Sequence, residues 1–509
     1  MPSHRRLSCS ILAMIGLLAP PPLRAGDFEL TVIDADTKQP IACRMHLFNA
    51  NGRPRKIKKY PYWHDHFVFP GTVKFDLPKG TYKFELERGP EYVMHTGHFV
   101  IEPFSDDRKT VELQRHVNMA EEGWYAGDLH IHRPVKDIEL LMRAEELYVA
   151  PVITWWNEKS EWEKEPLPEN PLVEFEDGRY AHLLAGEDER EGGALLYFNL
   201  PRPLDLTGST REYPSPLSFV EQARRHEGVH IDAEKPFWWD VPTWLAGGEI
   251  DSIGLANNHM CRGEMYRDEA WGKPRDEKRL PSPWGNGEWS QEIYYHVLNA
   301  GLRIPPSAGS ASGVLPNPVG YNRVYVYCGD DFSYESWWEG LRAGRVMVTN
   351  GPLLRPIVNG RYYPGEVFQG EAGDSLEFNI ALNLATRDKI RYLEIVKNGE
   401  VAATVRLEEL AENNGRLPPV TFEESGWFLV RAVTDVEHTY RFASTGPYYV
   451  EIGERPRISR ASSQFFLDWV NERIARIQLD DEAQQREVLA PHERAREFWQ
   501  QRLDEATAE

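Results

Sequence analysis

The stretch Gly127-Asp128-Leu129-His130-Ile131-His132 decides how this chain is interpreted. It ends an apolar run, and Arg133-Pro134 follows at once, as expected where a short buried strand stops. Because side chains alternate along a strand, both imidazoles lie on one face, where neutral ring nitrogens can share one metal ion. We attribute the same spacing in His64-Asp65-His66 to chance, because the chain has 16 histidines.

Composition and charge restrict what this chain can bind. With 509 residues and 41% hydrophobic content, it can bury a large core and form about three domains. The formal net charge of -21 argues against nucleic acid as a partner, because phosphate binding needs a basic face. Cys43, Cys261 and Cys328 permit at most one disulfide in the mature chain, so we expect a fold that does not depend on disulfides.

Residues 1–25 are predicted to be a secretory signal. Arg5-Arg6 precede an apolar run from Leu7 to Leu18, and Leu23-Arg24-Ala25 offers a cleavage site. The apolar run is too short for a membrane span, and no other run approaches the length of about 18 residues that a span needs. We therefore expect an exported protein, periplasmic or extracellular, without a membrane span.

The rest of the chain predicts a multidomain α/β plus β fold in four segments. Residues 27–115 alternate short apolar runs with turns, which predicts an N-terminal β-sandwich similar to carboxypeptidase-regulatory-like domains. Residues 120–355 alternate apolar strands with helical stretches, which favours a parallel (βα) barrel with ligands at the carboxyl ends of its strands. Residues 356–455 return to strand patterns and predict a second β-sandwich. Residues 459–509 carry apolar side chains at helical spacing and predict a C-terminal helix packed on the body.

Three motifs in the second of these segments, residues 120–355, resemble a known family. The run from Trp124 to His132 is similar to the opening signature of the PHP (polymerase and histidinol phosphatase) superfamily, and more narrowly to its CehA/McbA-like branch. Leu184-Ala185-Gly186-Glu187 resembles the family's Gly-Glu segment, whose glutamate is a metal ligand, and Gly344 to Pro352 resembles the closing turn of the branch. The resemblance implies a distorted, seven-stranded PHP-type barrel and a metallohydrolase activity.

The sequence departs from that family at several ligand positions. Thr154-Trp155-Trp156-Asn157 stands where the family has Thr-Asp-His, and Gly309 to Gly313 lacks the aspartate and histidine of the late Gly-Ser-Asp-x-His element. A full trinuclear cluster is therefore not expected. His130, His132, Glu187 and His259 instead suit one divalent metal, zinc first, with manganese or iron as alternatives. Taken alone, His259 suits a core or capping histidine equally well.

A second group of polar residues lies at another predicted strand end. His230, Asp232 and Glu234 share one face there, where they can ligate metal or act as acid and base, with Lys235 stabilising developing negative charge. We place His230 among the candidate metal ligands and Asp232, Glu234 and Lys235 among the catalytic candidates. The alternative is a buried salt-bridge network around Lys235.

These features predict an exported hydrolase that uses a metal-activated water on an ester, amide, carbamate or phosphoester, in a small molecule or a glycan-linked substrate. Trp155, Trp156, Trp238, Trp239 and Arg323 are the candidate substrate-binding residues. The alternative function is a non-catalytic or metal-poor carbohydrate-binding protein, in which these tryptophans, together with Trp337 and Trp338, line a groove for sugar faces.

Overall fold

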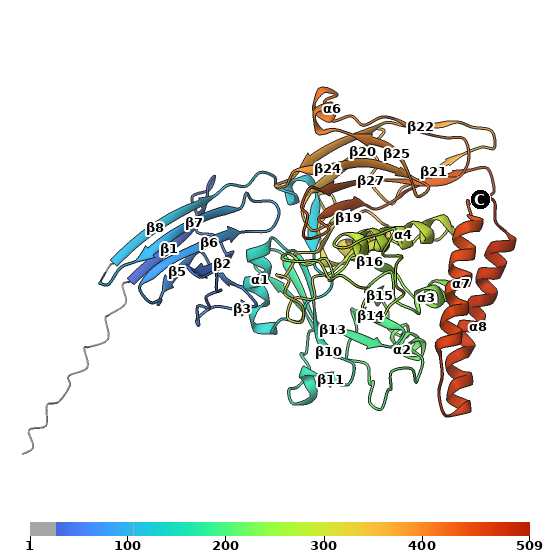
Figure 1. Ribbon diagram of the computed structural model, residues 1–509, viewed down its shortest axis with the longest axis horizontal. Helices are drawn as coiled ribbons and strands as arrows, with labels where there is room; N and C mark the ends of the chain where they lie inside the picture. Colours follow the sequence, from blue (N-terminus) through green and yellow to red (C-terminus); the bar gives the residue numbers. More distant parts are fainter. Residues whose placement is uncertain (1–26, 105) are drawn as a thin grey trace, which may run out of the picture.

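The computed structural model describes residues 27–104 and 106–509, and shows an α/β plus β protein built from several sheets (Figure 1). The predicted signal segment, residues 1–25, lies outside the described residues. Period-two alternation accounts for many of the strands: the first strand buries Phe28, Leu30 and Val32, while the residues between them are more exposed.

Two sheets enclose one apolar core in the N-terminal segment. A three-stranded sheet has the order β5-β1-β8, and a five-stranded sheet has the order β3-β4-β2-β6-β7. Phe28 of the first sheet stacks on Phe99 of the second, with ring centroids 4.4 Å apart. The strands are β1 (Asp27–Asp34), β2 (Cys43–Asn49), β3 (Tyr62–Trp63), β4 (His66–Phe69), β5 (Thr72–Phe75), β6 (Gly80–Glu87), β7 (His95–Ile101) and β8 (Asp106–Leu113).

The middle segment contains a mixed sheet with helices packed against it. Its strands are β9 (Trp124–Gly127), β10 (Val149–Trp156), β11 (Lys159–Ser160), β12 (Leu172–Phe175), β13 (Arg179–Arg190), β14 (Gly193–Phe198), β15 (His230–Ala233), β16 (Ser252–Ala256), β17 (Pro306–Ala308), β18 (Arg323–Tyr327) and β19 (Val346–Thr349). Its helices are α1 (Ile138–Glu145), α2 (Pro216–Ala223), α3 (Val241–Gly247), α4 (Gly285–Asn299) and α5 (Tyr334–Arg342).

Strand pairing in this sheet follows the order β9, β10, β13, β14, β15, β16, β17. Just beyond β9, the Leu129 amide donates to the Ala308 carbonyl at the end of β17, at 3.1 Å. The expectation of a wholly parallel arrangement is wrong at β14, which runs antiparallel to β13 and β15. The reason is the tight Glu191-Gly192 turn between β13 and β14, since a two-residue connection can join only antiparallel strands.

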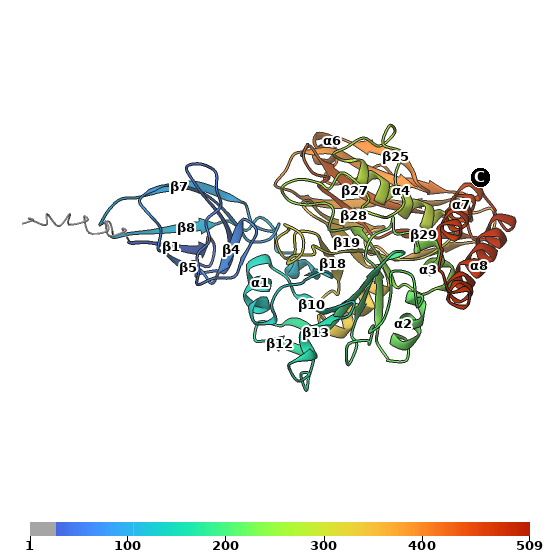
Figure 2. The same cartoon turned by 60° about the horizontal axis from the view of Figure 1, so that its bottom comes forward.

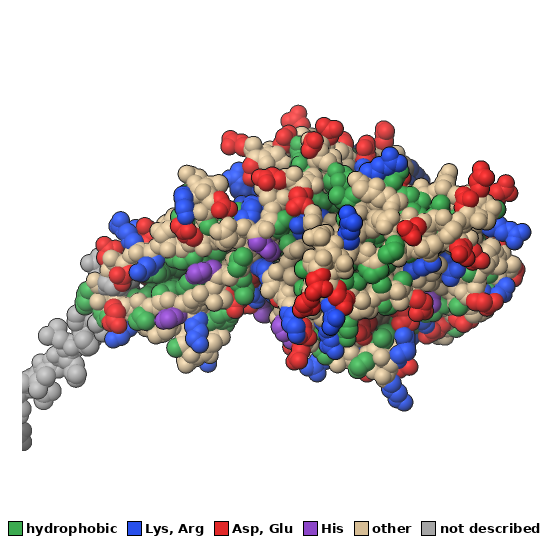
Figure 3. Space-filling view, turned by 90° about the horizontal axis from the view of Figure 1, so that it is seen from above, with side chains coloured by type: hydrophobic (Ala, Val, Ile, Leu, Met, Phe, Trp, Pro, Cys, Tyr) green, Lys and Arg blue, Asp and Glu red, His purple; other side chains and the backbone are tan. Residues whose placement is uncertain are grey.

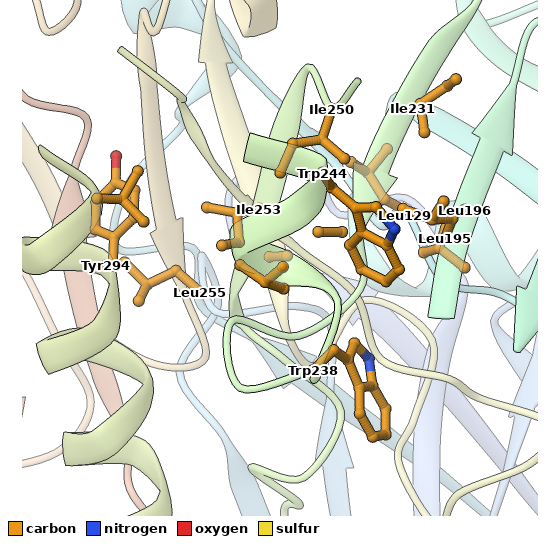
Figure 4. Packing of buried hydrophobic residues seen from close by; sticks show 14 of the residues in the cluster. Leu129, Leu195, Leu196, Ile231, Trp238, Trp244, Ile250, Ile253, Leu255 and Tyr294 are labelled. Atoms are coloured by element: carbon orange, nitrogen blue, oxygen red, sulfur yellow. The ribbon is translucent and has the colours of Figure 1, made fainter. Parts of the chain in front are cut away.

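The apolar interior of the middle segment is shared by strands and helices. Leu129, Leu195 and Ile253 come from the sheet region, and Trp244 comes from α3; all four are at most 1% exposed. Figure 4 shows these side chains gathered in one buried cluster. The burial of residues on both sides of the sheet explains why its strands are almost continuously apolar.

The third segment is again built mainly of strands. These are β20 (Leu353–Val358), β21 (Val367–Gly370), β22 (Leu376–Phe378), β23 (Ile380–Ala385), β24 (Ile390–Lys397), β25 (Glu400–Val405), β26 (Val420–Phe422), β27 (Gly426–Thr434), β28 (Phe442–Thr445) and β29 (Tyr448–Ile452), with the short helix α6 (Leu407–Glu412). Strand β19 pairs with β28, so backbone hydrogen bonds continue from the middle segment into this one.

The C-terminal tail forms two helices, α7 (Arg460–Arg476) and α8 (Glu482–Asp504), which lie side by side at one end of the molecule (Figures 1 and 2). The prediction of a single helix is wrong, because Asp481 caps a new helix through its side chain, which accepts hydrogen bonds from the amides of Ala483 and Gln484. The predicted apolar stripe is core: Phe466 and Trp469 are fully buried.

Asp240 anchors this tail to the middle segment. Its carboxylate lies 2.6 Å from Arg473 Nε of α7 and 3.1 Å from His492 Nε2 of α8. The Trp499 indole donates to the Pro242 carbonyl at 2.9 Å nearby. One buried carboxylate therefore joins both tail helices to the body.

Two adjacent carboxylates at the end of α1 join the N-terminal sheets to the middle segment. Figure 2 shows those sheets projecting from the body, with α1 where they meet. Glu145 is paired with Arg44 of β2 at 2.5 Å, and its carbonyl accepts from Arg323 at 2.6 Å. The next residue, Glu146, pairs with guanidinium groups from Arg88, Arg115 and Arg179. Both glutamates are at most 2% exposed, so their charges depend on these arginines.

Several general expectations can be compared with the structure. In the described ranges, the thiols of Cys43, Cys261 and Cys328 are all unpaired, so the one permitted disulfide is not formed. None of the helices in these ranges is long and apolar enough to cross a membrane. On the face shown in Figure 3, acidic and basic side chains are interspersed rather than gathered by sign.

Replacing Asp240 with Asn tests the tail anchor. Burial alone would raise the pKa of the Asp240 carboxyl, but Arg473 and His492 hold this pKa well below its usual value. The carboxylate therefore stabilises the fold above pH 4, near its unfolded pKa of about 3.9, and this contribution is lost as the pH falls. We expect Asp240→Asn to lower the free energy of unfolding by about 1.5–3 kcal/mol at pH 7 and by less at pH 3, in urea titrations.

The matched control is Asp468→Asn, because Asp468 is exposed on α7 and, in residues 27–104 and 106–509, bonds only within that helix, to Gln464. Equal stability of Asp240→Asn and the unsubstituted protein at pH 7 would show that the helices are held by apolar packing instead.

Candidate metal centre

Three side chains converge at the predicted site: His130 and His132 beyond β9, and Glu187 of β13. Their ligand atoms form a triangle, with His130 Nε2 to His132 Nε2 at 3.0 Å, His132 Nε2 to Glu187 Oε2 at 3.1 Å and His130 Nε2 to Glu187 Oε2 at 3.5 Å. Bonds of about 2.0–2.1 Å to a tetrahedral zinc give ligand separations of about 3.3 Å. These three residues therefore form a group that could hold a metal ion, which is as far as the geometry bears on the predicted ligand set.

Asp128 fixes the chain that carries the two histidines. Its carboxylate accepts hydrogen bonds from the amides of His130 at 3.0 Å, Ser310 at 2.9 Å and Gly320 at 2.7 Å. Gly309 allows the neighbouring strand to come close, because a Cβ there would lie 2.4 Å from the Cβ of His130. The two imidazoles are therefore held by a rigid backbone rather than by a free loop.

Glu234 contacts the ring nitrogen of His130 that does not belong to the triangle, and so orients this ring. Its Oε1 lies 3.4 Å from Nδ1 of His130, the ring nitrogen opposite the one in the triangle, and accepts from Asn258 at 2.6 Å. Its other oxygen accepts from Trp238 at 2.9 Å and forms an ion pair with Lys235. Metal-binding histidines commonly donate their second nitrogen to a carboxylate in this way. Glu234 and Lys235 therefore form the buried salt bridge that we gave as the alternative, and their assignment as catalytic groups is corrected to positioning groups.

The electrostatics of the cluster favour a positive charge at its centre. Burial alone would lower the pKa of His130, but the carboxylates of Glu187 and Glu234 outweigh burial and raise it to about 10. In turn, the two imidazoles hold the pKa of Glu187 well below its usual value despite its burial. Glu187 Oε2 is buried and faces the two imidazole nitrogens of the triangle, His132 Nε2 at 3.1 Å and His130 Nε2 at 3.5 Å. A divalent cation fits this donor set, since it would bind that oxygen and replace the proton on His130.

The structure does not bring His230, Asp232 or His259 into the triangle. His230 Nε2 lies 2.7 Å from Ser252 Oγ, and Asp232 accepts hydrogen bonds from Ser252 and Ser307 in the interior. Burial raises the pKa of Asp232 to about 7. His259 Nδ1 is hydrogen-bonded to the carbonyl oxygen of Asp268 at 3.1 Å. These residues pack the core around the cluster, and the predicted four-ligand set is not formed.

Most of the predicted substrate-binding residues are structural. Arg323 is 2% exposed and holds Glu145, as described above. Trp155, Trp238, Trp239, Trp337 and Trp338 are at most 3% exposed, whereas Trp156 is partly exposed. The groove of tryptophans on which the carbohydrate-binding alternative depends is therefore not formed.

A cavity of about 600 Å³ lies beside the triangle. Trp156 connects the two, since it lines the cavity and its ring centroid lies 5.3 Å from that of His132. Glu189 also lines the cavity, two residues beyond Glu187 on the same face of β13. The other cavity residues are Asn157, Glu158, Lys159, Arg190, Leu206, Ser209, Thr210 and Arg211.

Sequence reasoning missed Asp128, Asn258 and Glu189 as site residues. Strand alternation from Glu187 could have identified Glu189, and Asp128 stands within the opening motif itself. Asn258 carries no signal in the sequence, because its contact with Glu234 joins residues 24 positions apart.

Comparison of the chain with protein-family models, with curated proteins and with solved structures returned no match. The similarity to the PHP superfamily therefore stays a prediction from the motifs.

Substitution of both histidines tests the metal centre. We expect His130→Ala with His132→Ala to remove about one equivalent of metal relative to the unsubstituted protein, because two of three converging ligands are lost. Inductively coupled plasma mass spectrometry on protein purified without chelator measures this. The control is His98→Ala, an exposed histidine of β7. Unchanged metal content in the double variant would contradict the assignment.

Proposed function

We propose that this protein is a metal-dependent hydrolase acting on an ester, amide, carbamate or phosphoester at the His130, His132 and Glu187 cluster. The observation that carries the proposal is the triangle of three ligand atoms, 3.0–3.5 Å apart, beside a cavity of about 600 Å³. A bound divalent cation, zinc first, supplies Lewis acidity and an activated water at neutral pH. Three protein ligands rather than four leave room for that water.

The fold we infer for this region is a distorted PHP-type barrel. In support, seven strands pair in sequence from β9 to β17, and the Leu129 amide returns to the carbonyl of Ala308. His132 lies just beyond the carboxyl end of a strand, as do ligands in barrels of parallel strands. The export predicted from residues 1–25 belongs to the same proposal.

Side chains around the cluster and the cavity have separate roles in the proposed hydrolysis. Glu234 holds the ring of His130, and Trp156 contacts the ring of His132 and lines the cavity. Glu189 is the carboxylate that both lines the cavity and shares a strand face with Glu187, so we assign to it the transfer of the water proton to the leaving group. Lys159 and Arg211 give the cavity two cationic side chains for an electronegative part of the substrate.

Replacing Glu189 with Gln tests this function. We expect Glu189→Gln to lower kcat by about 10²–10⁴-fold, as for loss of a general acid or base, while metal content stays unchanged. The assay uses metal-loaded protein and nitrophenyl esters, anilides, carbamates and phosphoesters.

Glu158→Gln is the matched control, because Glu158 lines the same cavity but is exposed and accepts from the Gly208 amide. Its kcat should stay close to that of the unsubstituted protein. The hydrolase proposal would be contradicted if the protein turned over no ester, amide, carbamate or phosphoester and still bound glycan after its metal had been removed with chelator.

A further inference from the structure

We propose that the N-terminal sheets hold a second metal site, for zinc or a similar cation, formed by His46, Asp65 and His66 and closed by His64. This site is separate from the His130 cluster and does not depend on the proposed hydrolase function. The His64-Asp65-His66 spacing, which the sequence alone led us to attribute to chance, is here completed by a histidine from another strand.

Strand pairing places the two buried imidazoles together. His46 of β2 stands directly opposite His66 of β4 in antiparallel register, so their side chains leave the same face of the sheet. Their ring centroids lie 5.1 Å apart. Asp65, in the turn before β4, reaches both rings: one oxygen lies 3.2 Å from Nδ1 of His46 and the other 3.1 Å from Nδ1 of His66. These separations match the ligand spacing of about 3.3 Å expected around zinc.

His46 supplies the second, independent observation. The side chain is 1% exposed; its Nδ1 faces Asp65 at 3.2 Å, and its Nε2 has no hydrogen-bond partner in the described part of the chain. An unsatisfied buried polar group costs about 1–3 kcal/mol. A cation on His46 Nδ1 would replace any proton there and fix the tautomer in which Nε2 carries the proton and faces Glu87. On the far side of the ring, Nε2 lies 4.0 Å from Glu87, the carboxylate backing that metal-bound histidines commonly have.

Neighbouring charges leave Asp65 as the carboxylate available to the cation. Glu87 is already paired with Arg44 at 3.1 Å, Arg262 at 2.6 Å and Arg387 at 3.1 Å. Arg262 also forms an ion pair with Glu85 at 2.6 Å. Within the described part of the chain, Asp65 forms ion pairs only with imidazoles, and His64 Nδ1 is the third of these at 3.7 Å. Because His64 is largely exposed, its ring can turn inward as the fourth donor of a closed, structural site.

The site would fix a hairpin that touches the first centre. The β3–β4 hairpin carries Trp63, whose indole donates to the Leu315 carbonyl at 2.7 Å. The guanidinium of Arg133, the residue after His132, lies 5.5 Å from the Trp63 ring centroid, and it donates to the Tyr62 carbonyl at 3.4 Å. Metal binding at His46, Asp65 and His66 would therefore hold the N-terminal sheets against the chain that carries the first pair of ligands.

The test removes the two histidine ligands of the first centre and measures the zinc binding that remains. Full-length protein carrying His130→Ala and His132→Ala is stripped with chelator and titrated with Zn²⁺ by calorimetry. We expect about one equivalent to bind, and we expect Asp65→Asn in the same background to abolish this binding while the circular dichroism spectrum is unchanged. With Co²⁺ in place of zinc, the visible absorption of a tetrahedral site should appear in the first protein and vanish in the second.

Two further variants keep the test decisive. His64→Ala changes only an exposed side chain and should weaken Zn²⁺ binding without affecting folding, whereas His98→Ala on β7 should bind as the background protein does. Absence of Zn²⁺ binding in the background protein, or equal binding after Asp65→Asn, would overturn the proposal and leave Asp65 as a bridge between two neutral histidines. Neither result bears on the hydrolase, because two of its three ligands, His130 and His132, are absent from every protein in this series.

Discussion

Burial of Glu145 and Glu146 is the constraint on which the arrangement of the other parts depends. Two carboxylates at the end of one short helix cannot stay charged away from water unless cations reach them, and removal of one partner of such a pair costs about 3–5 kcal/mol. The cations come from Arg44, Arg179 and Arg323, that is, from the N-terminal sheets and from two separate strands of the middle segment. The N-terminal candidate metal site lies close to this junction, since Arg44 is two residues from His46.

The two candidate metal sites differ in a way that suits different tasks. The first has three candidate ligands beside a cavity, and its carboxylate, Glu187, is buried. The second combines buried His46 and His66 with exposed His64, so a fourth donor stands next to it and no cavity is needed. Catalytic zinc sites keep an open position and structural ones are closed. One chain would therefore use the same side-chain chemistry once for reaction and once for architecture.

How far the sequence could predict this structure is clear from neighbouring residues. The pair His130 and His132 could be identified because alternation along a strand is local, and Glu187 followed from a motif. Trp155 and Trp156 could not be told apart, since adjacent residues face opposite sides of a strand and only the tertiary packing decides which side is buried. His46 could not be joined to His66, because the register of two strands depends on pairing that no local pattern records.

The bond from Asp128 to Ser310 spans 182 residues, and this separation has a consequence for how the protein is made. At about 5–20 residues per second, synthesis of that stretch takes about 10–40 s on the ribosome. Throughout that interval His130 and His132 have left the ribosome without the strand that fixes their backbone. The first centre is thus assembled late, whereas Asp65 and His66 emerge only about 20 residues after His46. Order of emergence would let the N-terminal site take its cation while the His130 group is still unformed.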